Sequence, residues 1–545
     1  MSLKRLLSRE ASIKFIPRTM SLLCLAIMQG ALAATALAQG LPNGGNVTHG
    51  QAVIHSAGNT MQIHQNSANA VIDWNSFNID NGHSVNFQVP TGGATLNQIA
   101  GAASQINGNL NSNGTLYLLN PNGILFGKGA SVNVGSLVAT TSALSADNFM
   151  NGNRTFTGEG KGKIGNAGTI IAATGGSVVL AGAGMISNTG TIVVPEGSIQ
   201  MVSGDKFTLS MATQNPFLSV TLDATATGAQ VENMGGTLRA GSINLQAVRR
   251  VVSTGTVEAS SLADLKGAVN FSADAVVVNG KVTSQGDITI GGKDTVQITG
   301  AHLSAENDIK ATANGFLSVF DSTLRTADGS IALTSDARLA VRGSNLEANA
   351  GDIELRGVGH GTQFHKHLTG VLIEDSTLKA TSPDVAKGRI RVKADAHADR
   401  GAYERGAAFV GSTLTGNGID IYGHGQSGVF FHGGTMLHAE HITISGTGEG
   451  FGPNTLGVTF AGSNQLTADK TLNITGQGGV AGVLFSDSHT LVNSPQSLVS
   501  GNTLQPGIPS GVGIKFTGQV AFQSGDPDAS TTFLSDGYAV TPPTI

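Results

Sequence analysis

The chain has 545 residues and a formal net charge of −5, with 76 glycines, one tryptophan and only 12% charged residues. Because an average protein has about 7% glycine and about 25% charged residues, this composition excludes an ordinary set of compact globular domains. The hydrophobic fraction of 40% is enough for a core and excludes wholesale disorder.

The first 38 residues have the pattern of a secretory signal peptide. A basic start with five Lys or Arg residues precedes an apolar run over residues 20–37, and Ala36 and Ala38 provide small residues for cleavage before Gln39. Cleavage would also remove Cys24, the only cysteine, and would leave 26 basic and 35 acidic residues, a net charge of −9. This acidic balance excludes a typical nucleic-acid-binding chain. No second apolar run reaches the roughly 18 residues of a membrane helix.

The most specific segment covers residues 40–141. It contains the phrases Val71-Ile72-Asp73-Trp74-Asn75, Leu96-Asn97-Gln98-Ile99, Asn120-Pro121-Asn122-Gly123-Ile124 and Val132-Asn133-Val134-Gly135-Ser136-Leu137. The third phrase predicts a rigid corner between apolar strands at 116–119 and 124–126. Pro121 and Asn122 suit the two central positions of a type I turn, Gly123 supplies a positive φ, and the Asn120 side chain can bond to the backbone two residues on.

The order of these phrases resembles the haemagglutination-activity, or two-partner secretion, domain of the filamentous haemagglutinin family. The resemblance implies that a partner outer-membrane transporter with periplasmic recognition domains reads this segment. The residues that it marks for recognition are Asn75, Asn97, Asn120, Pro121, Asn122, Gly123 and Ile124. One position departs from the family, which often has Arg or Lys where this chain has Gln98. Trp74, beside Phe77, is expected to lie in the core.

Downstream, short apolar strands alternate with Gly, Asn and Asp turns at a fixed period. Ile288, Ile309, Ile331 and Ile353 follow similar turns and are 21 or 22 residues apart. The phrase that ends at Ile170 recurs 22 residues later, and an Asp/Gly-Ser-Thr/Asn-Leu phrase recurs at 321, 343, 375 and 411. Such a period is the signature of a solenoid. The sequence therefore predicts an all-β, right-handed parallel β-helix with an N-terminal cap and a few extra-helical strands or loops.

Four regions are expected along the chain. They are the signal peptide at 1–38, a secretion domain with the first coils at 39–300, further coils at 301–500 that become irregular over 358–460, and a C-terminal tail at 501–545 that is partly disordered. The irregular region holds His360, His365, His367, His397, His424, His432, His438 and His441.

Catalytic and metal sites were weighed and disfavoured. Asp287, Asp308 and Asp352 have the spacing of carboxylates on neighbouring coils, but Asp is also a natural turn residue. The run from Lys393 to Arg400 is interpreted as a solvated loop. His365 and His367, with His360, could bind zinc or copper, but a surface cluster is favoured. No cofactor, metal or catalytic residue is therefore predicted.

The leading functional hypothesis is a non-enzymatic exoprotein of a Gram-negative bacterium, exported through the periplasm and secreted or held at the cell surface. It would act in adhesin-like attachment to a host-cell or carbohydrate ligand. Two alternatives stay open: a β-helical carbohydrate-active enzyme, and a short relative of a cytolysin or contact-dependent toxin carrier.

Overall fold

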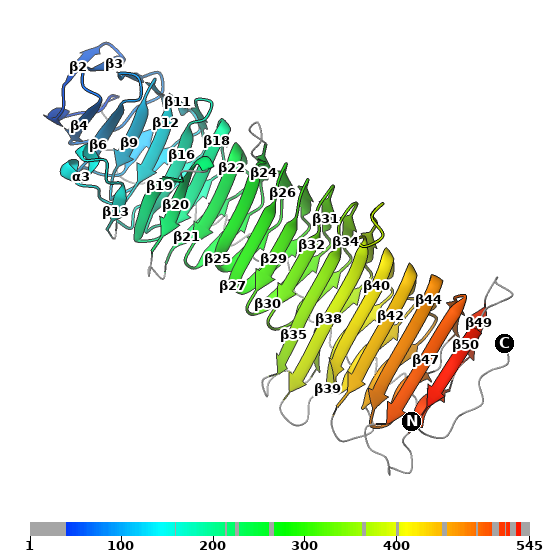
Figure 1. Cartoon of the computed structure of the whole chain (residues 1–545). Helices are drawn as coiled ribbons and strands as arrows, with labels where there is room; N and C mark the ends of the chain where they lie inside the picture. The colour runs from blue at the N-terminus through cyan, green and yellow to red at the C-terminus, as the bar shows by residue number, and fades with distance from the viewer. Residues whose placement is uncertain are drawn as a thin grey trace. The chain divides into compact units, whose positions relative to one another are not determined.

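The computed structural model describes residues 40–158, 160–212, 215–223, 228–260, 266–361, 367–398, 403–449, 455–486, 489–503, 512–517, 519–523 and 530–535. Within them, 47 strands pair into one continuous sheet and three strands form a second, smaller sheet. In Figure 1 the strands of the large sheet stack side by side as successive coils. The predicted parallel β-helix is therefore confirmed.

Three walls make up each coil. The first wall runs through β4, β6, β9, β12, β16 and on to β50, the second through β7, β10, β14 and β17, and the third through β5, β8, β11 and β15. In all three walls the coils pair in parallel, so each strand hydrogen-bonds to the coil before it and to the coil after it. Long strands such as β18 and β22 bend and serve two walls.

The N-terminal coils begin with a short antiparallel cap. Strand β1 pairs with β4 in antiparallel fashion, and the β2–β3 hairpin covers β5, so antiparallel strands lie at the N-terminal end of both walls. The strands of this part are β1 (Asn46–His49), β2 (Ala52–Ala57), β3 (Thr60–Gln65), β4 (Asn69–Trp74), β5 (Ser84–Gln88), β6 (Ala94–Ile99), β7 (Ser104–Ile106), β8 (Asn109–Ser112), β9 (Thr115–Leu119), β10 (Ile124–Phe126), β11 (Ser131–Val134) and β12 (Ser136–Thr140).

An extra-helical layer follows, in agreement with the predicted extra strands. Its sheet joins β13, β19 and β20 in antiparallel pairs. The elements of this part are α3 (Ala146–Met150), β13 (Thr155–Thr157), β14 (Ile164–Asn166), β15 (Thr169–Ala172), β16 (Ser177–Gly182), β17 (Ile186–Asn188), β18 (Thr191–Ser203), β19 (Lys206–Ala212) and β20 (Asn215–Leu222).

The central coils carry the 21–22-residue period. Ile288, Ile309, Ile331 and Ile353 are register partners from coil to coil, and each is fully buried, as predicted. The strands are β21 (Gln230–Asn233), β22 (Thr237–Ala247), β23 (Arg250–Ser253), β24 (Thr256–Ala259), β25 (Ala268–Val278), β26 (Lys281–Ser284), β27 (Ile288–Thr299), β28 (His302–Ala305), β29 (Ile309–Ala313), β30 (Phe316–Phe320), β31 (Thr323–Thr326), β32 (Ile331–Ser335), β33 (Leu339–Arg342), β34 (Asn345–Ala348) and β35 (Ile353–Gly361).

Beyond β35 the coils continue with wider spacing. Ile353 pairs with Ile390, which is 37 residues further along the chain. The strands are β36 (His367–Glu374), β37 (Thr377–Ala380), β38 (Arg389–Ala398), β39 (Tyr403–Val410), β40 (Thr413–Gly425), β41 (Ser427–His432), β42 (Met436–Gly448), β43 (Leu456–Ala461), β44 (Gln465–Gly478), β45 (Ala481–Ser486), β46 (His489–Asn493), β47 (Gln496–Thr503), β48 (Val512–Phe516), β49 (Gln519–Gln523) and β50 (Ser530–Ser535). The last three strands lie in the predicted tail and pair with earlier coils. The other described residues of the tail are 501–503, at the end of β47, and Thr517.

Ladders of identical side chains hold the coils in register. The phenyl rings of Phe409, Phe431, Phe460 and Phe485 stack with centroids 4.9 Å apart, close to the spacing of hydrogen-bonded strands. The serines of the Asp/Gly-Ser-Thr/Asn-Leu phrase form a second ladder. In it the Oγ atoms of Ser344, Ser376 and Ser412 each accept the backbone N–H of the serine one coil earlier.

The residue before each of these serines has a positive φ. Asp321 and Asp375 have φ of 49° and 47°, and Gly343 and Gly411 both have φ of 55°. Among ordinary residues, Gly and Asp tolerate this left-handed conformation best. The alternation of Asp and Gly in the repeated phrase therefore follows from one backbone requirement.

Candidate functional site

The Asn120–Ile124 corner joins β9 of the first wall to β10 of the second wall. Asn120 is fully buried and anchors the corner. Its Oδ1 accepts the backbone N–H of Asn122 at 3.0 Å, as predicted, and its Nδ2 donates to Ala102 O and Ser104 Oγ. The N–H of Gly123 closes the turn by donating to Asn120 O at 3.0 Å.

Gly123 is required at its position for two reasons. Its φ is +114°, in the region that disfavours side chains, as the sequence predicted. A Cβ at residue 123 would also lie 2.7 Å from the backbone oxygen of Lys163, one coil away. That oxygen accepts the N–H of Ile124, a buried residue, so the corner and the next coil fit against each other closely.

Asn97 is fully buried beside Trp74, on the neighbouring strand of the first wall. Its Oδ1 accepts the indole N–H of Trp74 at 2.9 Å, and its Nδ2 donates to Tyr117 O at 3.1 Å. Trp74 is 2% exposed and packs edge-on against Phe77, which confirms its expected place in the core. Asn97 therefore ties three successive strands together through one buried side chain.

A pocket of about 470 Å³ lies at this end of the first wall. Of the residues predicted for recognition, Asn75 and Pro121 line it, and both are exposed. Asn97 lies behind the wall, where it holds Trp74. Asn120, Asn122, Gly123 and Ile124 are not among the lining residues. The full lining is Gly44, Asn46, Asp73, Trp74, Asn75, Gln98, Ile99, Ala100, Leu119, Pro121, Thr141, Ser142 and Ala143.

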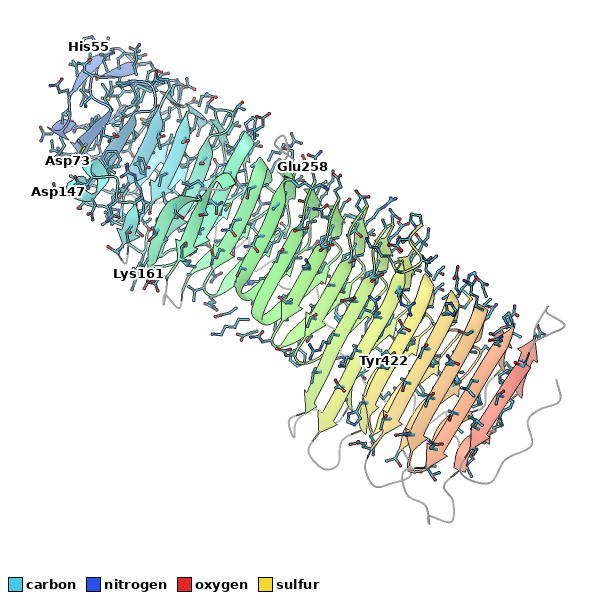
Figure 2. The ribbon with its side chains drawn as sticks, viewed as in Figure 1. His55, Asp73, Asp147, Lys161, Glu258 and Tyr422 are labelled. Atoms are coloured by element: carbon cyan, nitrogen blue, oxygen red, sulfur yellow. The ribbon has the colours of Figure 1, made fainter. Side chains whose placement is uncertain are left out.

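Three of the lining residues carry buried oxygens that have no hydrogen-bond partner in the described protein. They are Asp73 Oδ1, Thr141 Oγ1 and Ser142 Oγ. Figure 2 labels Asp73 at the N-terminal end of the coils. Thr141 and Ser142 are only 3% and 2% exposed. Sequence reasoning missed these residues, because the segments around 73 and 141 belong to different coils and no periodic pattern links them.

Gln98, the position that departs from the family, is the register neighbour of Asp73. Its side-chain Nε2 does not pair with that carboxylate. Instead it donates to the backbone oxygen of Leu144 at 2.9 Å and so attaches the segment after β12 to β6. The departure therefore leaves Asp73 beside an amide rather than beside a cation.

The extra-helical layer covers the outer surface of the same coils. Phe149 of α3, Phe156 of β13 and Phe207 of β19 form a second core against outward-facing residues of the first wall such as Tyr117. Arg154 fastens this layer: its guanidinium lies 4.6 Å from the ring centre of Phe149, and its Nε donates to Tyr117 Oη at 3.1 Å. The layer therefore shields the outer face of the secretion signature.

The aspartates weighed as catalytic carboxylates are turn residues. Asp287 Oδ1 accepts the N–H of Asp308, Asp308 Oδ1 accepts the N–H of Ser330, and Ser330 Oγ accepts the N–H of Asp352. Each side chain thus caps the turn of the next coil, in agreement with the favoured interpretation. Asp352 continues the ladder by accepting the N–H of Arg389 at 2.9 Å.

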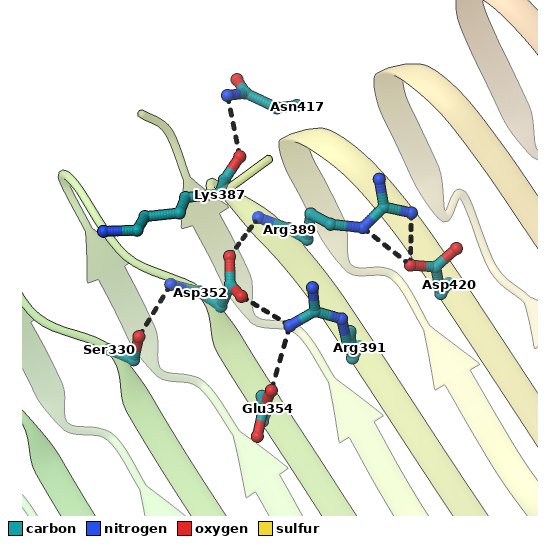
Figure 3. A network of polar contacts seen from close by, with 8 residues as sticks. All are labelled: Ser330, Asp352, Glu354, Lys387, Arg389, Arg391, Asn417 and Asp420. Atoms are coloured by element: carbon teal, nitrogen blue, oxygen red, sulfur yellow. Dashed lines mark hydrogen bonds and ion pairs between the residues drawn. The ribbon is translucent and has the colours of Figure 1, made fainter. Parts of the chain in front are cut away.

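Ion pairs occupy the carboxylates at the end of this ladder (Figure 3). Arg391 binds Asp352 and Glu354 together, and Arg389 binds Asp420 through two nitrogens. Burial of the Arg391 guanidinium opposes its charge, but the two carboxylates outweigh burial and raise its pKa. A carboxylate held in this way is a structural partner rather than a free general base.

The run of ionisable residues from Lys393 to Arg400 was predicted as a loop, and that prediction is wrong for its first part. Residues 393–398 continue β38, because they pair in parallel with β35. The rest of the run lies outside the described residues.

The histidines weighed as zinc or copper ligands lie partly outside the described residues. The side chains of His360, His365, His367 and His397 lie outside the described set. The other histidines contact separate groups, with His438 near Asp469 and His441 bonded to Thr471. No group of three metal-ligating side chains occurs in the described ranges.

The predicted signal peptide, with Ala36, Ala38 and Gln39, also lies outside the described residues. In the part of the chain that the structure covers, no helix is long and apolar enough to cross a membrane.

The N-terminal part of the chain, which includes residues 40–141, is similar to a known protein family. Residues 38–312 match the family model described as the TPS secretion domain. Two heme/hemopexin-binding proteins of Haemophilus influenzae, one of them from strain Rd, are each 34% identical to this chain, over 284 and 285 residues. The matches cover 49% and 46% of this chain but only 31% and 30% of those proteins, so the chain spans about a third of the length of these relatives.

A solved structure, the HMW1 secretion domain from Haemophilus influenzae, aligns with 89% of this chain and 100% of its own length. The identity is 19% and the TM-score is 0.40. The family model covers half of the chain, from the cap through the extra-helical layer into the periodic coils. The chain therefore belongs to the two-partner secretion family of exoproteins, which are secreted across the outer membrane of Gram-negative bacteria.

Proposed function

We propose that this chain is exported by a partner outer-membrane transporter with periplasmic recognition domains and then acts in surface attachment. The observation that carries the first half is the family match over residues 38–312. In this proposal residues 1–38 direct the chain to the periplasm, with cleavage after Ala38. Residues 39–300 form the secretion domain, and the coils from 301 onward form the surface-exposed part.

Export of an unfolded chain agrees with the composition and with the topology. The only cysteine, Cys24, precedes the proposed cleavage site, so no disulfide can lock the chain in the periplasm. The cap formed by β1, β2 and β3 covers β4 and β5 of the first coil, and each later coil can then add in parallel to the one before it. The free energy of stacking would be released outside the cell and would oppose backward movement of the chain.

A row of outward-facing side chains on the later coils supports attachment. Arg356, Lys393 and Tyr422 are register neighbours on β35, β38 and β40, and all three are exposed. Figure 2 labels Tyr422 on the broad face of these strands. Neither Arg356 nor Lys393 forms an ion pair with a described residue, in contrast to Arg389 and Arg391. Two cations beside an aromatic ring provide the chemistry for an acidic carbohydrate.

Secretion can be tested in cells that express the chain together with a candidate partner outer-membrane transporter. Deleting residues 40–141 should leave the protein in the periplasm, while the wild-type chain reaches the medium or the cell surface. The matched control is the triple variant R356A/K393A/Y422A, which should be exported normally. Normal export of the deletion variant would contradict the proposal.

Attachment can be tested with the purified full chain on immobilised heparin as the acidic glycan and on neutral dextran. The wild type should bind heparin in a salt-dependent way, and R356A/K393A/Y422A should lose most of that binding. The control is R239A/K281A, which removes two cations engaged with Glu258 on earlier coils. Equal losses in the two variants would show general charge attraction and would contradict a site on β35–β40.

The relatives suggest a second ligand. Both are named as heme/hemopexin-binding proteins, and the matched part covers about half of this chain. In this alternative the chain would bind the same ligands through that half. Titration of the purified chain with hemin, followed by absorbance, and with hemopexin, followed by surface plasmon resonance, would separate it from glycan attachment.

A further inference from the structure

We propose that the pocket lined by Asp73, Trp74 and Ser142 is a binding site for a lysine or arginine side chain presented by a peptide segment of another protein. The site is a property of the folded coils, and the proposal stands whether or not the transporter proposal holds. It rests on unpartnered acceptors, on the absence of a cation in the lining, and on the apolar walls.

The unpartnered atoms of the pocket are all oxygens. Asp73 contributes a carboxylate oxygen, and Thr141 and Ser142 contribute hydroxyl oxygens. A buried acceptor without a partner costs free energy until a donor reaches it. A lysine ammonium has three N–H donors, an arginine guanidinium has five, and neither has an acceptor. The Thr141 and Ser142 hydroxyls can accept as well as donate, whereas the Asp73 carboxylate can only accept. A cationic donor therefore complements the pocket, and an anion would meet the Asp73 carboxylate.

The described part of the chain supplies no positive charge to this pocket. None of the residues that line the pocket is Lys or Arg. Gln98, the register neighbour of Asp73, uses its Nε2 to bind Leu144 O, and the Trp74 indole N–H is bonded to Asn97. A cation that pairs with Asp73 inside this pocket therefore has to arrive from outside.

The remaining walls suit the stem of a long cationic side chain. Trp74, Ile99, Leu119 and Pro121 give the pocket apolar surface beside its oxygens. Lysine and arginine bury their methylene stems along such surface while the charged head meets a polar partner. The volume of about 470 Å³ far exceeds the roughly 30 Å³ of a single water molecule, so one bound water does not fill it.

The pocket can be reached from solvent. Asn75 and Pro121, which line it, are exposed, and Asp73 is partly exposed although its Oδ1 is buried. The floor is rigid, because Trp74 is held by Phe77 and by Asn97. A pocket that is open to solvent and has a rigid aromatic residue at its base can hold a long side chain.

Trp74 is the only tryptophan and lines the pocket, so its fluorescence should change when the pocket is occupied. The purified full chain would be titrated with n-butylguanidinium and n-butylammonium while Trp74 fluorescence is followed at constant ionic strength. The controls are n-butanol, which has the stem without the charge, and guanidinium chloride, which has the charge without the stem. A saturable change with both alkyl cations, and with neither control, is expected.

Variants separate the pocket from the rest of the surface. D73N should weaken the apparent affinity for n-butylguanidinium at least tenfold, and S142A should weaken it less. D80N, a change at a carboxylate that does not line the pocket, should leave it unchanged. Q98R places a guanidinium next to Asp73 within the chain and should abolish the response while far-UV circular dichroism stays that of the wild type.

Three results would overturn the proposal. One is the lack of a saturable change with either alkyl cation, another is an equal response to n-butanol, and the third is an undiminished response in D73N. The first would mean that the pocket holds solvent only, the second that binding does not need the charge, and the third that Asp73 does not hold the cation. Because every readout is made on purified protein, a failure here is distinct from a failure of the secretion assay.

Discussion

The indole N–H of Trp74 donates a 2.9 Å hydrogen bond to Oδ1 of Asn97, which lies one coil further along the first wall. Asn97 in turn donates to Tyr117 O on the coil after that. A single buried amide thus connects three coils of the secretion signature and fixes the floor of the pocket. The stability of this end of the solenoid should depend on it.

Asn97→Ala should lower the free energy of unfolding of the N-terminal coils by about 2–4 kcal/mol, because it leaves the buried indole N–H and Tyr117 O unpartnered and opens a small void. Urea unfolding followed by Trp74 fluorescence measures this region directly. The control is Asn109→Ala, whose amide bonds Ser84 at the surface and whose loss should cost less than about 0.5 kcal/mol. Similar effects of the two variants would argue against the linking role of Asn97.

Gly123→Ala should destabilise the same coils by more than Gly92→Ala. Both glycines have positive φ, +114° and +72°, so both substitutions carry a backbone cost of about 1–2 kcal/mol. Only residue 123 adds a steric conflict, since its Cβ would lie 2.7 Å from Lys163 O, whereas nothing lies within 4 Å of a Cβ at 92. Thermal unfolding of the two variants, followed by Trp74 fluorescence, should show the larger drop in Tm for Gly123→Ala.

Phe431→Ala should cost about 3–5 kcal/mol, because the ring is 1% exposed and stacks between Phe409 and Phe460. Since solenoids unfold in parts, the loss should concentrate in neighbouring coils. Amide hydrogen exchange should therefore show faster exchange around β39–β43, with little change in β4–β9. Phe316→Ala removes a ring that is 51% exposed and should leave exchange near its wild-type rates.

Acid should loosen the turn ladder at Asp308. Burial of the Asp308 carboxyl disfavours its charge, but hydrogen bonds from Lys310 and from the Ser330 N–H outweigh burial and hold its pKa below the ordinary value of 3.8. Because the pKa is lower in the folded state than in the unfolded state, the ionised carboxylate stabilises the fold above about pH 4. That contribution is lost as the pH falls through the folded pKa.

D308N removes this titration, so its stability should fall less steeply than that of the wild type as the pH drops below about 4. Urea midpoints between pH 5 and pH 2 measure the difference. D328N, a change at an exposed neighbour, should keep the wild-type slope. A wild-type slope in D308N would show that the Asp308 carboxylate contributes nothing that depends on pH.

Much of the solenoid could be predicted from the sequence, because stacking makes equivalent residues recur. An isoleucine recurs every 21 or 22 residues because successive coils of one wall place it at the same position. The register pairs follow this period at Ile288, Ile309, Ile331 and Ile353. The corner at Asn120 was equally accessible, since its turn depends on adjacent residues.

The site itself was less accessible. The pocket joins Asp73 to Ser142 across 69 positions without any repeat between them. Arg154 contacts Tyr117 from a layer outside the period. The sequence pattern predicted a loop at Lys393, whereas this residue lies in β38. The reason is that the outward-facing residues of a strand can be as rich in charge as a loop. Contacts between residues far apart in the sequence depend on which coils become neighbours, and the local sequence pattern does not specify this.

The wide coil between Ile353 and Ile390 has a consequence for how such a chain can diversify. Thirty-seven residues separate these partners where 22 separate Ile331 from Ile353, yet both pairs meet in the same parallel register. The extra residues include the longer ends of β35 and β36, and these ends pair with β38 and β39 of the next coil. The coils that follow keep longer strands, so length can be added to a coil while the isoleucine register of the wall is kept. The solenoid thereby separates the buried residues that set the register from the residues whose number can differ between coils.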